Sequence, residues 1–427
     1  GGGIASVTSA EKAALSPSIG DFVYDTDLSS LQRYNGSNWI SVANGYRLVS
    51  VTNSSGVPTY YTNLKTAYDS TSLGVVVLHS DITVNAVNTI TFKDGVYINL
   101  NGYAYTYDVA DGSAVFNTSG SVVGFEFGVY NGYVNRLNQS GGTYAINIGT
   151  NANVDLSNLT FINSSNMCLA TNSKTKAFGS RFEANGSGQG NLISSSGVLN
   201  GGSLIHSGTG ENRCSGGTLY KVYCESVSSN AIQILNNGKG YHLNGKSTSG
   251  DGLRATSGSK LYHSTGISTS GSGAVLGGSS VAEYCTGEST TGIGFYAVSG
   301  STYYCKGVSS TGIAFYVGVL AEFCTATTNS GSYAYLMGNI NSSLINSIGN
   351  VNSGTGSGVD INSTGCKVID CKMFLSSSSA YGLVPGGRST FVNGLKVKGS
   401  TQLINWGGAS LNAWTATADA QLNSAQL

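Results

Sequence analysis

A repeat of about 20 residues is the feature that constrains this chain most. Three segments align with one another: AEYCTGESTTGIGFYAVSG (282–300), TYYCKGVSSTGIAFYVG (302–318) and AEFCTATTNSGSYAYLMG (321–338). Their shared cysteines, Cys285, Cys305 and Cys324, are separated by 20 and 19 residues. Upstream, Ser264 and Gly273 keep the same frame. A repeat this short cannot bury its own apolar side chains, so successive copies must stack on each other.

This period favours a parallel β-helix. Leucine-rich repeats have a similar length, but their Leu/Asn consensus is missing here. In a β-helix, each coil holds two or three short strands joined by polar turns, and coils stack about 4.8 Å apart. Equivalent side chains then form files along the axis, which explains why Phe295 is repeated as Phe315. We therefore predict an all-β fold, a right-handed parallel β-helix over residues 73–405 with roughly 16 coils.

The two ends of the chain differ from the repeats. A capping box, Thr8 with Glu11, precedes a helix of two turns, and strand patterns around Asn35-Gly36 predict a β-hairpin over residues 20–42. A second short helix is expected within residues 60–72, with Thr62 or Asn63 as its N-cap. The expected parts are an N-terminal attachment module (1–48), a linker and capping helix (49–72), the β-helix (73–405) and a C-terminal tail or cap (406–427).

Composition limits the functional classes. Lys and Arg number 21, and Asp and Glu also number 21, so the net charge is zero, which argues against nucleic-acid binding or a polybasic membrane module. Charged residues make up only 10% of the chain, against roughly 25% in ordinary soluble domains. No apolar run approaches the roughly 20 residues of a membrane helix, so membrane insertion is not expected. The composition suits a neutral, β-rich, extracellular particle.

Two regions resemble a known family. The stretch TSAEKAALSPSIGDFVYDTDLSSLQRYNGSNWISV (8–42) resembles the short modules of bacteriophage tail fibres. The segments NLKTAYDS (63–70), VVVLHSDITV (75–84) and TFKDGVYINLNGYAYT (91–106) resemble the entry into the pectate-lyase-like β-helix of a phage tailspike. The resemblance implies a homotrimeric, extracellular virion protein. Such a protein binds a bacterial surface polysaccharide, sometimes cleaves it, and contacts other virion proteins through its N-terminal module.

Two carboxylates are candidates for acid–base catalysis. Glu283 and Glu322 occupy the same position in alternate coils, with Tyr303 between them. Two coils separate them by roughly 9.6 Å, near the upper end of the roughly 6.5–9.5 Å used by inverting glycosidases. The alternative is a pair of solvated glutamates on a neutral wall. The remaining acidic residues considered look scattered and form no better pair: Glu126, Asp155, Glu183, Asp360 and Asp370.

Aromatic files are the stronger hint of a binding surface. Tyr296, Tyr316 and Tyr335 are assigned to one file, and alternation along the strand predicts that they point outward while Phe295 and Phe315 point inward. Outward files would offer rings to sugars. A second file is expected to contain Tyr284, Tyr304 and Phe323. The predicted glycan-binding residues are Tyr296, Tyr316, Tyr335, Tyr303 and Trp406.

The eight cysteines favour packing over chemistry. A ladder formed by Cys285, Cys305 and Cys324 could be a disulfide or metal site, but a buried ladder of free thiols is the favoured interpretation. No zinc-type Cys/His spacing exists, so neither a metal nor a cofactor is expected.

Three functions remain open. The first is attachment of a virion appendage to a surface glycan, and the second is a polysaccharide depolymerase, a glycosidase or lyase, on the same β-helix. The third is a bacterial surface adhesin or a capsid-decorating fibre.

Overall fold

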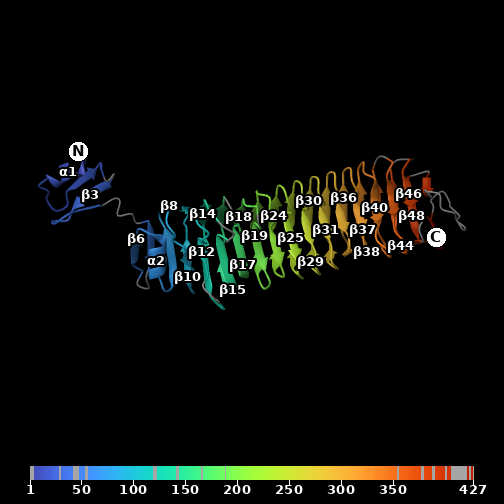
Figure 1. Cartoon of the computed structure of the whole chain (residues 1–427), viewed down its shortest axis with the longest axis horizontal. Helices are drawn as coiled ribbons and strands as arrows, with labels where there is room; N and C mark the ends of the chain where they lie inside the picture. The colour runs from blue at the N-terminus through green and yellow to red at the C-terminus, as the bar shows by residue number, and fades with distance from the viewer. Residues whose placement is uncertain are drawn as a thin grey trace.

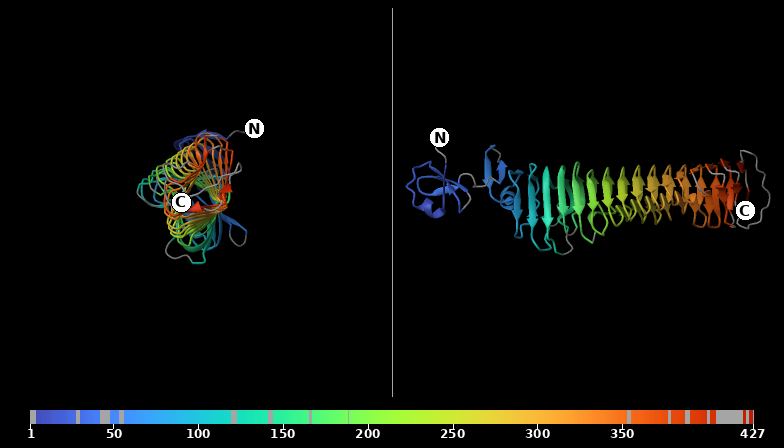
Figure 2. Two further views of the ribbon diagram at one scale, coloured as in Figure 1. Left: turned by 90° about the vertical axis from the view of Figure 1, so that its right-hand side faces the viewer. Right: turned by 90° about the horizontal axis from the view of Figure 1, so that it is seen from above.

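The computed structural model describes most of the chain. The residues described are 4–27, 30–41, 48–52, 56–118, 123–140, 144–164, 167–187, 189–352, 355–376, 379–386, 390–399, 402–404, 421–422 and 425–426. They form an all-β parallel β-helix of about 17 turns, with about 21 residues per turn and 3% helix. Figures 1 and 2 show the coils stacked into a long rod, with the N-terminal module beyond its first coils. The predicted fold class is confirmed, and the estimate of 16 coils is close.

Each coil contributes strands to three faces. Face 1 contains β7 (Gly74–Leu78), β10 (Val96–Asn99), β13 (Glu126–Tyr130), the second halves of β15 (Ile146–Asp155) and β17 (Leu169–Lys176), β20 (Val198–Asn200), β23 (Thr218–Tyr220), β26 (Lys239–Tyr241), β29 (Lys260–Tyr262), β32 (Val281–Glu283), β35 (Ser301–Tyr303), β38 (Leu320–Glu322), β41 (Ser343–Ile345), β44 (Cys366–Ile369) and β47 (Thr390–Asn393).

Face 2 follows face 1 along the chain after a short corner. It contains β8 (Ile82–Val84), β11 (Ala104–Asp108), β14 (Gly132–Leu137), β16 (Leu159–Asn163), β18 (Arg181–Ala184), β21 (Ser203–His206), β24 (Tyr223–Ser226), β27 (Asn244–Ser247), β30 (Thr265–Ser268), β33 (Thr286–Ser289), β36 (Lys306–Ser309), β39 (Thr325–Thr328), β42 (Ile348–Val351), β45 (Lys372–Leu375) and β48 (Leu395–Lys398).

Face 3 completes each coil. It contains β9 (Ile90–Thr91), β12 (Phe116–Asn117), the first halves of β15 and β17, β19 (Asn191–Ser194), β22 (Arg213–Ser215), β25 (Ile232–Leu235), β28 (Leu253–Ala255), β31 (Ala274–Leu276), β34 (Phe295–Ala297), β37 (Phe315–Val317), β40 (Tyr333–Met337), β43 (Ser357–Ile361), β46 (Tyr381–Val384) and β49 (Gln402–Ile404).

The core is built from inward files, as the repeat predicts. Phe295 and Phe315 are fully buried and stack with ring centroids 4.9 Å apart. Tyr335 continues this file, because it pairs with Phe315 and its ring lies 5.6 Å from that of Phe315. The assignment of Tyr335 to an outward file was therefore wrong. The outward partner of Tyr316 is Leu336.

The cysteine ladder is also part of the core. All eight cysteines are buried and free, in agreement with the favoured interpretation. Burial raises the pKa of the Cys214 and Cys371 thiols to about 12 each, which disfavours the reactive thiolate. No group of three or more His, Cys, Asp or Glu able to hold a metal ion occurs in the part of the chain that the structure describes.

A repeated Ser-x-x-Gly turn joins face 2 to face 3. The Ser309 hydroxyl donates to the Gly292 carbonyl of the previous coil at 2.8 Å and accepts from the Gly312 amide at 2.9 Å. Ser289 makes the same two bonds, to the Gly271 carbonyl and from the Gly292 amide. Gly271 is therefore the equivalent of Gly292, so the alignment of Gly273 was wrong by two residues, whereas Ser264 aligns with Cys285 as predicted. The serine hydroxyl thus satisfies a glycine amide of its own turn and a glycine carbonyl of the previous coil, at a place where the backbones of the two coils lie in contact.

The N-terminal module has the predicted capping box. The Thr8 hydroxyl accepts from the Glu11 amide at 3.2 Å, and Glu11 accepts from the Thr8 amide at 2.7 Å. The helix that follows, α1 (Ser9–Ala13), is shorter than the expected two turns. The antiparallel hairpin strands are β2 (Phe22–Asp25), β3 (Ser30–Tyr34) and β4 (Trp39–Ser41), and a further strand, β1 (Ala5–Val7), pairs in parallel with β2.

Both ends of the β-helix carry antiparallel strands. Before the first coil, β5 (Val49–Thr52) pairs with β6 (Pro58–Tyr61) and with β7, so part of the expected linker belongs to the sheet. The helix α2 (Leu64–Ser70) follows, capped by Asn63 as predicted. At the other end, β50 (Gln421–Leu422) and β51 (Ala425–Gln426) pair with β48 and β47. Among the described residues, neither helix is long and apolar enough to cross a bilayer.

Candidate functional site

Two rows of outward side chains run along face 1. The first outward file follows the strand register through Tyr97, Gly128, Asp155, Lys176, Asn200, Tyr220, Tyr241, Tyr262, Glu283, Tyr303 and Glu322. The second outward file lies two residues earlier on each strand and contains Glu126, Asn153, Lys174, Val198, Thr218, Lys239, Lys260 and Val281. Because successive coils are in register, side chains far apart in sequence form one continuous surface.

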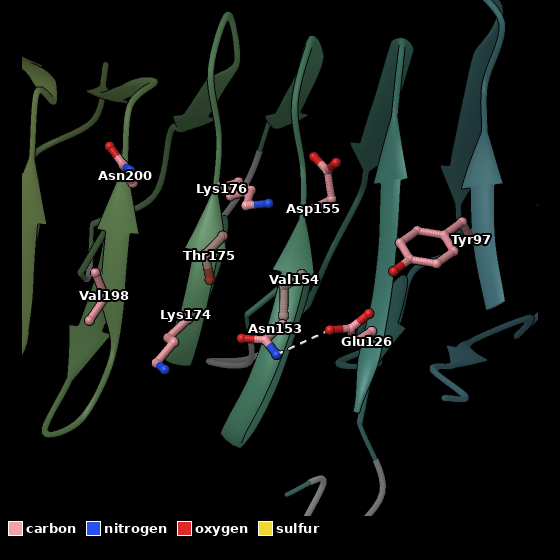
Figure 3. A pocket seen from close by; sticks show the side chains of 10 residues that line it. All are labelled: Tyr97, Glu126, Asn153, Val154, Asp155, Lys174, Thr175, Lys176, Val198 and Asn200. Atoms are coloured by element: carbon pink, nitrogen blue, oxygen red, sulfur yellow. Dashed lines mark hydrogen bonds between the residues drawn. The ribbon is translucent and has the colours of Figure 1, made fainter. Parts of the chain in front are cut away.

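A cleft of about 560 Å³ lies over the N-terminal part of these files. Its lining residues come from β10, β13, β15, β17 and β20: Tyr97, Glu126, Asn153, Val154, Asp155, Lys174, Thr175, Lys176, Val198 and Asn200. Figure 3 shows these side chains projecting from neighbouring strands. We attribute the hollow partly to Gly128, which leaves the first outward file without a side chain between Tyr97 and Asp155. A Cβ at Gly128 would meet the Asp155 carbonyl oxygen at 2.2 Å, so only glycine fits there.

The cleft contains both signs of charge. Glu126 and Asp155 lie beside the Tyr97 hydroxyl, and Lys174 and Lys176 lie on the next coil. Burial and the negative charges of Glu126 and Asp155 raise the pKa of Tyr97, so its hydroxyl remains protonated and able to donate a hydrogen bond. The Asn153 amide donates to Glu126 at 3.4 Å, which is the dashed line in Figure 3.

The two carboxylates of the cleft come from adjacent coils. Glu126 pairs with Asn153, and Asp155 lies two residues further along the same strand. This offset separates the two α-carbons by roughly 8 Å. The interpretation of Glu126 and Asp155 as scattered was therefore wrong. The sequence alone does not reveal how the strands of these early coils pair, and that pairing brings the two residues onto adjacent coils. Two carboxyl groups act as acid and base on a glycosidic bond when they lie about 6.5–9.5 Å apart, and side chains on α-carbons this close can reach that separation.

The predicted catalytic pair lies elsewhere on the same face. Glu283 pairs with Tyr303 and Tyr303 with Glu322, so the three occupy successive coils of the first outward file, as predicted. All three side chains are partly exposed. Neither glutamate lines the cleft.

A strained aromatic stack marks the corner between faces 1 and 2. The rings of His242, His263, Tyr284, Tyr304 and Phe323 stack with centroids 4.9–5.2 Å apart. Each of these residues has φ between 49° and 54°, the left-handed region, which costs roughly 1–2 kcal/mol for such side chains. Because neighbouring rings cover one another, the stack presents ring edges to solvent. Sugars therefore cannot lie flat on the inner rings of this stack.

The other predicted glycan-binding residues have different environments. Tyr296 and Tyr316 are partly exposed on face 3, as predicted, and meet edge to face with centroids 4.8 Å apart. The Tyr316 hydroxyl donates to Asn339 at 3.0 Å. Tyr335 is fully buried and cannot contact a glycan. Trp406 lies outside the described residues.

Comparisons with known proteins assign neither a family nor a function to this chain. No protein-family model matches the chain, and no curated protein matches it. Among solved structures, the A-module of the Azotobacter vinelandii mannuronan C-5 epimerase AlgE6 is 12% identical and has a TM-score of 0.39, covering 80% of this chain and 94% of that one. ORF18 of Geobacillus virus E2 is 14% identical with a TM-score of 0.28, covering 94% and 76%.

A third solved structure is the catalytic domain of a GH87 α-1,3-glucanase in complex with nigerose. It is 12% identical, with a TM-score of 0.20, and the match covers 76% of this chain and 66% of that one. The three neighbours are thus a phage protein and two proteins whose names refer to polysaccharides. All three TM-scores are low, and nothing about the ligand or activity of this chain rests on them.

Proposed function

We propose that this chain is a bacteriophage virion appendage, of the tail fibre or tailspike type, that attaches to a bacterial surface polysaccharide. The observation that carries the proposal is the cleft on face 1, where an aromatic ring, an amide, two lysines and two carboxylates converge. Sugar chains are recognised by such sets, because they offer hydroxyl donors and acceptors beside apolar C–H faces. A few placed polar groups in a concave site give orientation and specificity.

The cleft side chains have separate tasks in this proposal. The Tyr97 ring packs against a sugar, Lys174 and Lys176 donate hydrogen bonds to hydroxyl or carboxylate oxygens, and Glu126 and Asp155 accept from sugar hydroxyls. Beyond the cleft, Tyr303 lies in the same first outward file and extends the surface along the rod. Single contacts of this kind are weak, so a homotrimer that presents three equal surfaces attaches through avidity.

Exposed side chains on the rod support assembly. Tyr284, Tyr304 and Phe323 are 51%, 49% and 44% exposed and form an apolar ridge that a neighbouring subunit would cover. The N-terminal module, with α1 and its four-stranded sheet, then contacts other virion proteins and leaves the β-helix free outside the particle. Mass spectrometry of purified virions tests whether the chain is part of the particle, which separates this proposal from a bacterial adhesin. The position of the chain on the virion, at the tail or on the capsid, separates the proposal from a capsid-decorating fibre.

Removing the cleft ring tests the attachment site. In a panel of immobilised capsular and lipopolysaccharide glycans, the full chain should bind at least one, and Tyr97→Ala should weaken that binding about tenfold, or about 1.4 kcal/mol. The matched control is Tyr133→Ala, since Tyr133 is 50% exposed on face 2, away from the cleft. Surface plasmon resonance gives both affinities. Equal affinities for the two variants would place the binding site elsewhere.

A depolymerase is the second candidate, favoured by the acidic pairs. In an inverting hydrolysis one carboxyl protonates the glycosidic oxygen as its bond to the sugar breaks, and the other removes a proton from the water that adds. Release of reducing ends from the bound glycan of the panel would show this activity. Loss of release in Glu126→Gln or Asp155→Asn would assign it to the cleft, whereas loss in Glu283→Gln or Glu322→Gln would assign it to the predicted pair.

A further inference from the structure

A second pocket lies far along the rod from the cleft, on face 3. It has a volume of about 360 Å³ and is formed where β40, β43 and β46 leave their preceding turns. The lining residues are Ser330, Gly331, Ser332, Tyr333, Thr355, Gly356, Ser357, Asp360, Tyr381 and Val384. These strands lie in the orange to red part of Figure 1, whereas the cleft strands are blue to green. The two sites therefore share no residue and no strand.

Asp360 is the unusual group of this pocket. The side chain is only 5% exposed, and its neighbours in register on the adjacent coils are apolar, Leu336 and Val384. Its Oδ1 atom is buried and has no hydrogen-bond partner among the described residues. Burial raises the pKa of Asp360, and a hydrogen bond from Tyr333 acts in the opposite direction. A buried acceptor without a partner destabilises the fold unless something else satisfies it.

Asp251, in the turn that leads into β28 of face 3, shows how a structural aspartate is satisfied. Asp251 accepts from the Ser272 amide at 3.0 Å and from the Arg254 guanidinium at 3.1 Å, so both of its oxygens have partners. Asp360 has no basic residue among its pocket neighbours. The Oδ1 atom of Asp360 therefore lacks a donor among the described residues, and a buried acceptor of this kind is explained when a ligand supplies the donor.

The rest of the pocket indicates what kind of donor fits. Tyr333 and Tyr381 supply partly exposed aromatic surface, and the serine and threonine residues of the turns supply hydroxyl groups at the rim. Neither a cationic nor a second acidic side chain lines the pocket, so a charged ligand would meet no counter-charge except Asp360. The volume is at the lower end of the range for small-molecule sites, which suits a single small ligand.

The geometry points to a second saccharide site, in which Asp360 accepts hydrogen bonds from vicinal hydroxyls of one neutral sugar packed between Tyr333 and Tyr381. The sugar hydroxyls satisfy the Oδ1 atom of Asp360, which the described residues leave without a partner, and the tyrosine rings cover the apolar face of the sugar. The inference stands apart from the cleft on face 1, and it would hold if that cleft bound nothing.

Saturation-transfer NMR on the full chain tests the inference, with glucose, galactose, mannose, N-acetylglucosamine and rhamnose as probes at millimolar concentration. At least one probe should give transfer signals. Thr355→Trp should abolish them, because Thr355 is exposed at the rim and a large ring there fills the pocket. Thr311→Trp is the matched control, since Thr311 precedes Gly312 as Thr355 precedes Gly356, in an earlier coil, and should leave the signals unchanged.

A second variant separates a binding role from a structural one. Asp360→Leu should abolish the signals and also raise the melting temperature, because leucine matches the neighbouring Leu336 and Val384. A structural carboxylate would instead give a lower melting temperature. The inference is overturned if none of the five neutral sugars gives a signal or if signals persist in Asp360→Leu. It is also overturned if glucosamine, added as a sixth probe, is the only sugar that binds, since that result would indicate recognition of an amine. The cleft variant Tyr97→Ala should leave the signals intact.

Discussion

Replacing Phe315 by alanine is expected to destabilise the β-helix by about 3–5 kcal/mol. Phe315 is fully buried and lies between two other core rings, those of Phe295 and Tyr335. Alanine would leave a cavity in the middle of a file whose backbone is held on both sides by adjacent coils. The coils have little freedom to collapse into such a cavity, because each is hydrogen-bonded to its neighbours. The midpoint of urea unfolding, followed by far-ultraviolet circular dichroism, measures the loss.

Tyr304→Ala is the control for this prediction. Tyr304 stacks between Tyr284 and Phe323 at 4.9 and 5.0 Å, a spacing like that of the core rings, but it is 49% exposed. Its removal should cost about 1–3 kcal/mol, because two ring contacts are lost at about 0.5–1.5 kcal/mol each. Equal losses for the two variants would mean that burial does not distinguish the core file from the corner stack.

A large backbone effect is expected at Gly312. A Cβ there would lie 2.2 Å from the Gly292 carbonyl oxygen and 2.7 Å from that of Thr291, both on the preceding coil. Neither atom can easily move, since the Ser309 hydroxyl already bonds the Gly292 carbonyl. Gly312→Ala should therefore destabilise the chain by about 3 kcal/mol or more, and Gly312→Val should prevent recovery of soluble, folded protein. Thermal unfolding and soluble yield measure these two effects.

Gly277 provides the matched control. A Cβ at Gly277 would meet only a methyl carbon of Thr256, at an ordinary 3.4 Å. Gly277→Ala should therefore leave stability unchanged or raise it by about 0.4–1 kcal/mol, through a less flexible unfolded chain. If Gly312→Ala were tolerated as well as Gly277→Ala, the close approach of successive coils at the turn would be disproved.

Much of the fold follows from the repeat because stacked coils convert sequence period into spatial neighbours. The alignment of Cys285, Cys305 and Cys324 gives the correct register for three coils. It fails for Tyr335, because the chain has one more residue between Gly331 and Tyr335 than between Gly312 and Phe315. A shift of one residue turns a side chain to the opposite face of a strand. Tyr335 therefore lies in the core.

The candidate site was harder to predict, since its residues come from coils without a visible repeat. Between residues 97 and 200 coil lengths vary, and β15 and β17 pair with shifts in register. Glu126 and Asp155 are 29 residues apart in sequence but lie on neighbouring coils. The sequence does contain a local sign of the cleft. In the alternation of Glu126, Phe127 and Gly128, a glycine takes an outward position on a strand, where a hollow can form.

Two pairs of lysines test the central claim, that a polysaccharide binds in the cleft on face 1, most directly. Lys174 and Lys176 line the cleft, whereas Lys246 and Lys306 are exposed on face 2, away from the proposed surface. The affinity for the polysaccharide selected from the panel should fall about tenfold or more in Lys174→Ala/Lys176→Ala and less than about twofold in Lys246→Ala/Lys306→Ala. Equal losses in the two double variants would show attraction by charge alone, and unchanged affinity in the cleft variant would contradict the claim.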